Sequence, residues 1–210
     1  MPLRGLLLIA LLCLTGRATA GVRPPPPRKQ VVVVAGLPGV GKTTLSKSLA
    51  HVMRARRHTC GDVVRGWIRA QGLPYSPDND RLASRHFAQT PGEIARQLAV
   101  KIRRSRKPLH VVDGVRSPAD LKVLKQQFDV RVVALKAPAR LRFDRMLARQ
   151  RFQGETVDYL RQRDRREIGL GLLHLLRQPF SRVDMSGHVS QVPHQARMLA
   201  DQLERSFSGR

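Results

Sequence analysis

From residue 30 onward, short apolar runs alternate with longer segments in which apolar residues recur every three or four positions. Residues 30–35 contain four consecutive valines, and an unbroken β-branched run of this kind is typical of a strand buried on both faces of a sheet. Residues 109–112 and 130–135 form two further apolar runs, and residues 182–185 are a shorter candidate for a last strand. Strands separated by helix-length segments predict βαβ units and a parallel sheet.

Helical periodicity covers most of the remaining chain. After the valine run, four apolar residues at helical spacing predict a helix over residues 44–57. Thr90 precedes Pro91 and stands three residues before Glu93, which predicts a capped helix start. The other helices are predicted over residues 63–71, 77–88, 117–127, 138–151, 157–168 and 192–207. The element order therefore predicts an α/β fold with three layers, α/β/α, around a parallel central sheet.

Residues 1–29 have a different composition. Arg4 precedes an apolar run over residues 6–14, and Ala18-Thr19-Ala20 has the pattern of a signal-peptide cleavage site. The apolar run is too short to cross a bilayer as a helix, so no stable transmembrane anchor is expected. Residues 21–29 are basic and Pro-rich, which is typical of an extended linker. We therefore expect a signal-like leader and linker before a domain over residues 30–207.

Composition narrows the classes of function. The chain has 210 residues, enough for one α/β domain. Its net charge of +24 favours polyanionic partners such as nucleotides, nucleic acid or anionic lipid. The alternative is a general enrichment in arginine, in which case the positive charge serves no partner. The charge is spread along the chain and aromatic residues are only 4%, so nucleic acid is not favoured. Cys13 and Cys60 have no metal-type spacing, which excludes a zinc site.

Residues 36–43 match the phosphate-binding pattern G-x-x-x-x-G-K-[ST] without a gap. The match lies between a predicted buried strand and a predicted helix, whose positive amino end would face a phosphate. Lys42 is expected to reach the β- and γ-phosphates, and the Thr43 hydroxyl to bind Mg²⁺. The motif predicts a P-loop that binds ATP with Mg²⁺, and GTP is not excluded. The predicted nucleotide-binding residues are Gly36, Gly39, Val40, Gly41, Lys42, Thr43 and Thr44.

Four more residues are candidates for this site. Asp113 ends an apolar run, where P-loop proteins often place a Mg²⁺-binding carboxylate; a turn or cap residue is the alternative. Asp62 would orient or deprotonate the hydroxyl of a phosphate acceptor, with a helix N-cap as the alternative. Arg65 and Arg116 are candidates for binding an anionic acceptor.

Residues 138–168 are a candidate helical lid. Arg142, Arg145 and Arg149 are spaced to share one helix face, which would neutralise charge on a transferred phosphoryl group; a solvated face is the alternative. The predicted catalytic residues are Lys42, Asp62, Arg145 and Arg149.

Five sequence pieces together resemble an archaeal family of uncharacterised P-loop proteins, which is similar to dephospho-CoA kinase and adenylate kinase-type nucleotide kinases. The pieces are GLPGVGKTT (36–44), GDVVR (61–65), VVDGVRS (111–117), PARLRFDRM (138–146) and RDRREIGLG (163–171). The resemblance implies a phosphotransferase with a five-stranded parallel core and a lid. It implies roles for Asp164, Arg166 and Glu167, which match the last piece. It also implies a base-binding loop near the C-terminus, where this chain departs from the family pattern with residues 184–187.

The leading prediction is an enzyme, a P-loop kinase that moves the γ-phosphoryl group of ATP to a nucleotide, nucleoside or coenzyme-like small molecule. The alternatives are a nucleic-acid-linked NTPase or polynucleotide kinase, and a nucleotide switch without turnover. An enzyme that consumes ATP belongs in the cytoplasm, so that location is favoured, with export after cleavage near Ala20 as the alternative.

Overall fold

A computed structural model of the chain describes residues 28–150, 155–177 and 179–209. Five strands form one sheet in the order β2-β3-β1-β4-β5, and every neighbouring pair is parallel. The strands are β1 (Gln30–Ala35), β2 (Arg56–Thr59), β3 (Leu109–Asp113), β4 (Asp129–Lys136) and β5 (Ser181–Asp184). The parallel sheet is confirmed, and so is the five-stranded core that the resemblance implied.

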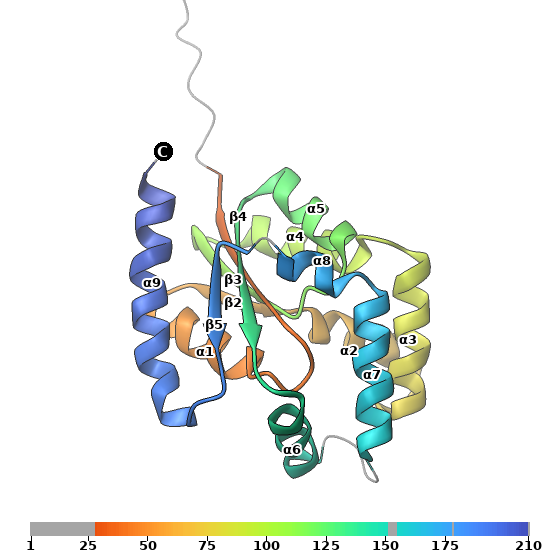
Figure 1. The fold of residues 1–210 in the computed structure, drawn as a ribbon. Coiled ribbons are helices and arrows are strands. Elements are labelled where there is room, and N and C mark those ends of the chain that lie inside the picture. The colour runs from red at the N-terminus through yellow and green to blue at the C-terminus, as the bar shows by residue number, and fades with distance from the viewer. Residues whose placement is uncertain (1–27, 151–154, 178, 210) are drawn as a thin grey trace, which may run out of the picture.

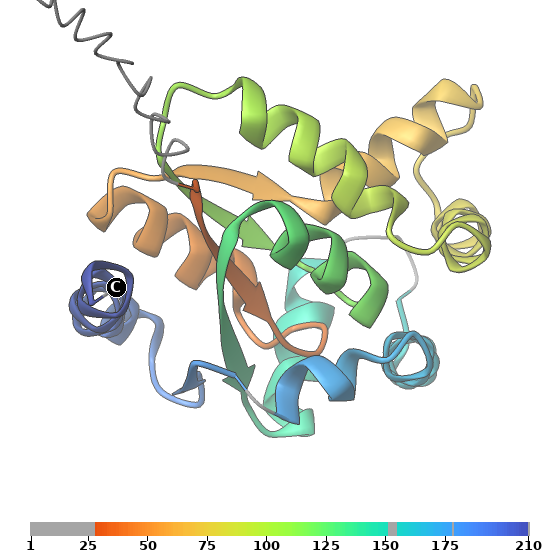
Figure 2. The ribbon, with the colours of Figure 1, turned by 90° about the horizontal axis from the view of Figure 1, so that it is seen from above.

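Helices cover both faces of the sheet (Figures 1 and 2). One face carries α1 (Lys42–Val52) and α9 (Val192–Ser208). The other face carries α2 (Cys60–Ala70), α4 (Glu93–Arg104), α5 (Pro118–Gln127) and α8 (Leu172–Arg177), and α3 (Pro77–Gln89) packs on α2. Helices α6 (Ala139–Arg149) and α7 (Val157–Gly169) lie near the carboxyl ends of the strands, and Val189–Gln191 form a 3₁₀ turn before α9.

The valine run in β1 connects the two halves of the core. Val32 and Val34 pack in the cluster under α1 and α9, whereas Val31 and Val33 pack in the cluster under α4, α5 and α8. All four side chains are fully buried. Successive strand side chains point to opposite faces, so an apolar run without alternation fits a strand covered on both sides. The predicted three-layer fold is confirmed.

The predicted helix over residues 44–57 is wrong at its carboxyl end. Helix α1 ends at Val52, and Arg54 then takes a left-handed backbone with φ of 50°. The chain enters β2, an edge strand that pairs with β3 and in which only His58 is buried. All four side chains of β2 are polar and only one is buried, so the segment has no apolar run that could have predicted a strand.

The starts of α2 and α4 also differ from the prediction. Helix α2 begins at Cys60, three residues early, because the Thr59 hydroxyl accepts a hydrogen bond from the Gly61 N–H at 3.1 Å. Thr90 does not cap α4; its hydroxyl donates to the His86 carbonyl at the end of α3, and α4 begins after Gly92, whose φ is 82°. Left-handed backbone is a conformation that glycine adopts without steric cost, so Gly92 ends the turn.

Of the predicted leader and linker over residues 1–29, residues 1–27 lie outside the described residues. Of the helices in the described part of the chain, none combines the length and the apolar character needed to cross a membrane.

Candidate active site

The predicted P-loop connects β1 to α1 in a tight turn. Gly39 and Gly41 have φ of 75° and 102°, a backbone that side chains with a Cβ rarely adopt. A Cβ on Gly39 would also lie 2.4 Å from the Arg142 carbonyl oxygen, so helix α6 leaves no room for one. Val40 is buried in the core beside this turn. The glycines therefore allow the turn and its close packing under α6.

Lys42 lies inside the loop. Its Nζ donates to the carbonyl oxygens of Gly36 at 2.6 Å and Leu37 at 3.0 Å. Burial lowers the pKa of Lys42 from 10.5 to about 8, and the Glu167 carboxylate acts in the opposite direction. The Lys42 ammonium group thus lies in a site that disfavours its positive charge. An anionic ligand bound beside it would stabilise that charge.

Asp113 ends β3 beside the P-loop, as its sequence position predicted. Its Oδ2 accepts hydrogen bonds from the hydroxyls of Thr43 at 3.1 Å and Ser46 at 3.3 Å. Arg57 Nη2, from β2, donates to the same oxygen at 2.7 Å, and Arg57 Nε donates to Ser46 Oγ at 2.8 Å. The carboxylate is only 4% exposed, so these three donors stabilise its charge in a buried position.

Thr43 and Asp113 fit a magnesium ion that arrives with a nucleotide. They supply one hydroxyl and one carboxylate, and Mg²⁺ is commonly bound by one or two such protein oxygens together with phosphate oxygens and water. Among the described residues, no group of three or more His, Cys, Asp or Glu side chains could hold a metal ion by itself. The donor set therefore suits a metal that is shared with phosphates.

Asp62 and Arg65 of α2 and Arg116, which follows β3, line the same cavity. Asp62 does not cap the helix, since Thr59 does; it pairs with Arg65 one turn later at 2.5 Å. Arg116 lies 3.4 Å from Glu167, and this carboxylate raises the pKa of Arg116. The structure thus places the three predicted acceptor residues in the lining of one cavity with the P-loop.

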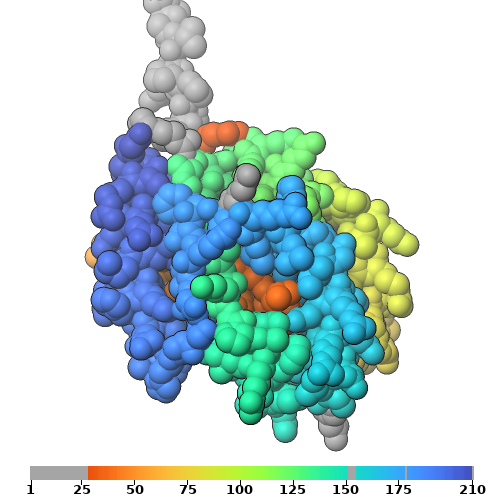
Figure 3. Space-filling view, viewed as in Figure 1, coloured from red at the N-terminus to blue at the C-terminus, as the bar shows by residue number. Residues whose placement is uncertain are grey.

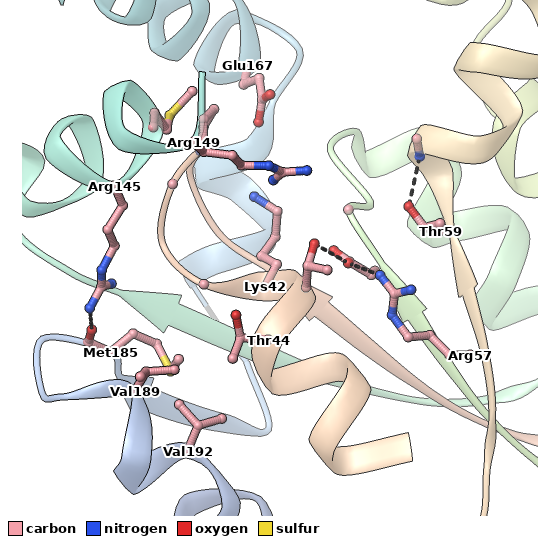
Figure 4. A pocket seen from close by; sticks show the side chains of 18 of the residues that line it. Lys42, Thr44, Arg57, Thr59, Arg145, Arg149, Glu167, Met185, Val189 and Val192 are labelled. Atoms are coloured by element: carbon pink, nitrogen blue, oxygen red, sulfur yellow. Dashed lines mark hydrogen bonds and ion pairs between the residues drawn. The ribbon is translucent and has the colours of Figure 1, made fainter. Parts of the chain in front are cut away.

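The three arginines of α6 predicted to share a face do not act together. Arg142 is buried and is used in packing: it donates to the Pro38 carbonyl at 2.9 Å and pairs with Asp164 of α7 at 2.7 Å. Arg145 donates to the carbonyl oxygens of Met185 at 2.9 Å and Gly187 at 3.4 Å. Arg149 extends toward the Lys42 side of the cavity (Figure 4). The inclusion of Arg142 in a phosphoryl-neutralising face is therefore wrong.

The loop after β5 closes the other end of the cavity. Met185, Val189 and Val192 line it on the side of Thr44 (Figure 4), Gly187 also lines it, and Arg145 is bonded to the loop backbone. Apolar side chains beside the P-loop suit the flat face of a base. This is the segment for which the resemblance implied a base-binding role.

Most of these groups line one cavity of about 580 Å³, whereas Gly36, Val40 and Arg142 are not among its lining residues. The P-loop segment, orange in Figure 3, is visible in a recess beside α6 and α7. Seven cationic and four carboxylate side chains line the cavity, an excess of three positive charges. The cations are Lys42, Arg57, Arg65, Arg116, Arg145, Arg149 and Arg163, and the carboxylates are Asp62, Asp113, Glu155 and Glu167. The charge balance favours anionic ligands.

Sequence reasoning missed Arg57 and Arg163. Arg57 was assigned to the end of a helix, and its partner Asp113 lies 56 residues away in the chain. Arg163 and Glu167 are buried on α7, one helical turn apart, with Nε and Oε1 at 3.7 Å. Leu160, Arg163 and Glu167 recur at the spacing of one helix face, so the pattern could have indicated that this charged pair points inward.

Comparison with known proteins agrees with this geometry. The family model described as "AAA domain" matches residues 32–165. The "UPF0200 protein" of Hyperthermus butylicus is 35% identical over 145 residues, which is 68% of this chain and 77% of that protein. The "UPF0200 protein" of Aeropyrum pernix is 30% identical over 83% of this chain and 94% of its own length. The resemblance to an archaeal family of P-loop proteins is confirmed.

Solved structures share the fold. Shikimate kinase from Acinetobacter baumannii in complex with shikimate superposes with a TM-score of 0.56 at 18% identity, covering 87% of this chain and 94% of that one. Shikimate kinase from Aquifex aeolicus gives a TM-score of 0.51 at 14% identity, covering 86% and 99%. At these identities the likeness extends to the P-loop α/β fold and not to a substrate.

Proposed function

Since the chain belongs to the AAA-domain family and to the archaeal UPF0200 group within the P-loop fold, we propose that it is a phosphotransferase. It uses ATP and Mg²⁺ to phosphorylate a small anionic molecule. One observation carries the proposal: a single cavity is lined both by the P-loop and by further cations, among them Arg65, Arg116 and Arg163. We assign the P-loop part of the cavity to a donor lobe and the part near Asp62, Arg65 and Arg116 to an acceptor lobe. A nucleotide switch without turnover needs the first lobe only, whereas a kinase needs both.

The donor lobe would hold the nucleotide. Backbone N–H groups of the P-loop and the amino end of α1 suit the phosphates, and Lys42 suits the β- and γ-phosphates. Thr43 and Asp113 are the residues that would bind Mg²⁺, which supplies charge neutralisation between the phosphates when bound. Met185, Val189 and Val192 would contact the base.

The acceptor lobe supports an anionic acceptor that carries a hydroxyl group. Arg65 and Arg116 would bind its phosphate or carboxylate group, since guanidinium groups bind such anions with two hydrogen bonds. Asp62 would accept the hydroxyl proton as the acceptor oxygen forms its new bond to phosphorus. The bond from the γ-phosphorus to the bridging β,γ-oxygen then breaks, and ADP leaves. Nucleotides, nucleoside derivatives and coenzyme-like molecules have this chemistry.

Arg149 is the cation of α6 best placed for the transferred group, because it extends toward Lys42 (Figure 4). Lys42, Arg149 and Arg163 would together neutralise the charge on the phosphoryl oxygens, and preorganised cations of this kind supply much of the rate in phosphoryl transfer. Arg145 would act differently, by holding the loop at Met185 against the base. We place the reaction in the cytoplasm, where ATP is available.

A screen with γ-labelled ATP, Mg²⁺ and an extracted metabolite pool tests the proposal. The wild type is expected to produce at least one labelled small molecule, and the Lys42→Met variant to lose this activity by at least about 100-fold. Lys47→Met removes an exposed lysine of the same helix and serves as the matched control, with activity near that of the wild type. A wild type that labels no acceptor, or a Lys42→Met variant that remains fully active, would contradict the proposal.

The acceptor assignment has its own test once a product is known. Arg65→Ala and Asp62→Asn are expected to weaken acceptor use while nucleotide affinity, measured by calorimetry, stays within about threefold of the wild type. If both variants instead bind nucleotide as weakly as Lys42→Met does, the two-lobe division of the cavity is wrong.

A further inference from the structure

The amino ends of three neighbouring strands bring basic segments together at the edge of the sheet opposite the active site. The register pairs Arg56 with His110 and Gln30 with Leu109. The residues just before β2, β3 and β1 therefore lie side by side, across about 10 Å for three strands. Figure 2 looks onto this edge, and α4 ends beside it.

This edge, which we call the amino-end basic surface, is formed by exposed cations. Its members are Arg28, Arg54, Arg56, Lys101, Arg104, Arg106 and Lys107. The contributing segments, residues 28–35, 53–60 and 94–112, contain no Asp or Glu. Lys29, beneath the surface, donates to the carbonyls of Ile102 at 2.8 Å and Arg103 at 3.1 Å, which ties the end of α4 to the start of β1.

Arginines elsewhere on the protein are of two kinds: some pair with a carboxylate, and others, among them Arg69, Arg85 and Arg165, are exposed and have no ion pair among the described residues. Arg65, Arg81, Arg96 and Arg161 each pair with a carboxylate one helical turn earlier in the chain. In the described residues, no ion pair involves any cation of the amino-end basic surface. What distinguishes this edge is that seven exposed cations gather at the amino ends of three neighbouring strands, in segments that contain no carboxylate.

Carboxylates close to the amino-end basic surface lie at its borders: Asp129 begins β4 beside Gln30 of β1 and pairs with Arg131 at 2.6 Å. A shallow hollow beside the surface is lined by Arg54, Lys107, His51 and Arg197 and by no carboxylate. The positive charges of Arg56 and Lys101 help to lower the pKa of the buried His58, after burial and His110. The exposed carboxylates Asp201 and Glu204 lie on α9 and limit the surface on that side.

We propose that the amino-end basic surface binds the phosphate backbone of a nucleic-acid duplex. Exposed guanidinium and ammonium groups without base-reading or stacking partners suit backbone phosphates. The surface has no aromatic side chain, which argues against a single strand, since its bases would need stacking platforms. Val100 is its only large exposed apolar residue among those described, which is too little for insertion into a lipid surface.

The surface lies at the opposite edge of the sheet from the P-loop, so the duplex is not the phosphate acceptor. Its binding is therefore independent of the proposed transfer reaction. The separation of the two sites also explains how a strongly basic chain can have a small-molecule cavity and a polyanion partner at once.

Charge reversal with a matched control tests the surface. The edge variant Arg54→Glu/Arg106→Glu/Lys107→Glu changes three exposed residues outside helices and strands. The control Arg69→Glu/Arg85→Glu/Arg165→Glu makes the same change in net charge on exposed positions of α2, α3 and α7. Probes are 20-base-pair RNA and DNA duplexes, a 20-nucleotide single strand, and vesicles with phosphatidylserine, followed by fluorescence anisotropy or sedimentation at 50–200 mM salt.

We expect the wild type to bind a duplex, and the edge variant to bind it at least about tenfold more weakly with a salt slope lower by roughly 2–3. The control variant should stay within about threefold of the wild type. Circular dichroism and thermal unfolding check that both variants fold, and ATP consumption should be unchanged in the edge variant. Equal losses in both variants, absence of duplex binding near 150 mM salt, or preferential binding of vesicles or the single strand would each overturn the proposal.

Discussion

Lys42 is expected to destabilise the ligand-free protein below its own pKa. Burial lowers its pKa from 10.5 to about 8 in the folded state. Between these values the unfolded chain binds more protons than the folded one, so stability rises with pH through this window. A shift of this size corresponds to at most about 3 kcal/mol of stability that is missing below pH 8 and present above pH 10.5.

The Lys42→Met variant removes this dependence. We expect the difference in unfolding free energy between the wild type and the variant to move in favour of the wild type by up to about 3 kcal/mol from pH 7 to pH 10.5. Urea unfolding followed by circular dichroism at both pH values measures it. Other titrating groups are shared and cancel in the difference.

Lys47→Met is again the control, since Lys47 is exposed on the same helix. Its stability relative to the wild type should be the same at both pH values. A Lys42→Met difference that is also constant within about 0.5 kcal/mol would show that the ammonium is not held in a desolvated site, and the physical basis for its strong attraction to phosphate would be refuted.

Three further predictions concern the frame around the site. Gly39→Ala forces a Cβ to within 2.4 Å of the Arg142 carbonyl at a φ of 75°, so nucleotide binding measured by calorimetry should be lost and unfolding should be easier by roughly 1–3 kcal/mol; unchanged affinity would mean that the loop moves freely. Arg142→Met leaves the Asp164 carboxylate without its partner and should cost about 3 kcal/mol in urea unfolding, with part recovered in Arg142→Met/Asp164→Leu; no recovery would point to packing alone. The pKa of His58 is lowered from 6.5 to about 4 by burial and by His110, so the unfolded state gains protons first and stability should fall as pH drops from 6.5 to 4, by at most about 3 kcal/mol; His58→Gln should flatten this fall, and an unchanged slope would contradict it.

The elements predictable from sequence are those whose signals are local. Three such signals lie within about 20 residues of one another: the β1 valines, the glycines of the P-loop and the periodicity of α1. Each of them predicts one local structure, a buried strand, a phosphate-binding turn or a helix. They locate the donor lobe and the central strand of the sheet. Asp113 could be placed beside them because parallel strands end at the same edge.

The remainder depends on contacts between distant segments. Strand β2 is stabilised by its pairing with β3, so its four residues carry little pattern of their own. Arg142 and Arg149 share a helix, yet Asp164 holds the first in the interior whereas the second lines the cavity. The sequence pattern of an amphipathic helix is the same whether its arginine binds a carboxylate of the protein or a phosphate of a ligand. Only the three-dimensional structure distinguishes these two roles.

The stoichiometry of phosphoryl transfer tests the proposed function most directly. With γ-labelled ATP, Mg²⁺ and the metabolite pool, ADP, inorganic phosphate and labelled organic product are measured in the same reaction over time. A phosphotransferase predicts close to one labelled product for each ADP and little inorganic phosphate, with both products absent for Lys42→Met. ADP matched by inorganic phosphate, whatever small molecule is supplied, would contradict the proposed function and identify an NTPase instead.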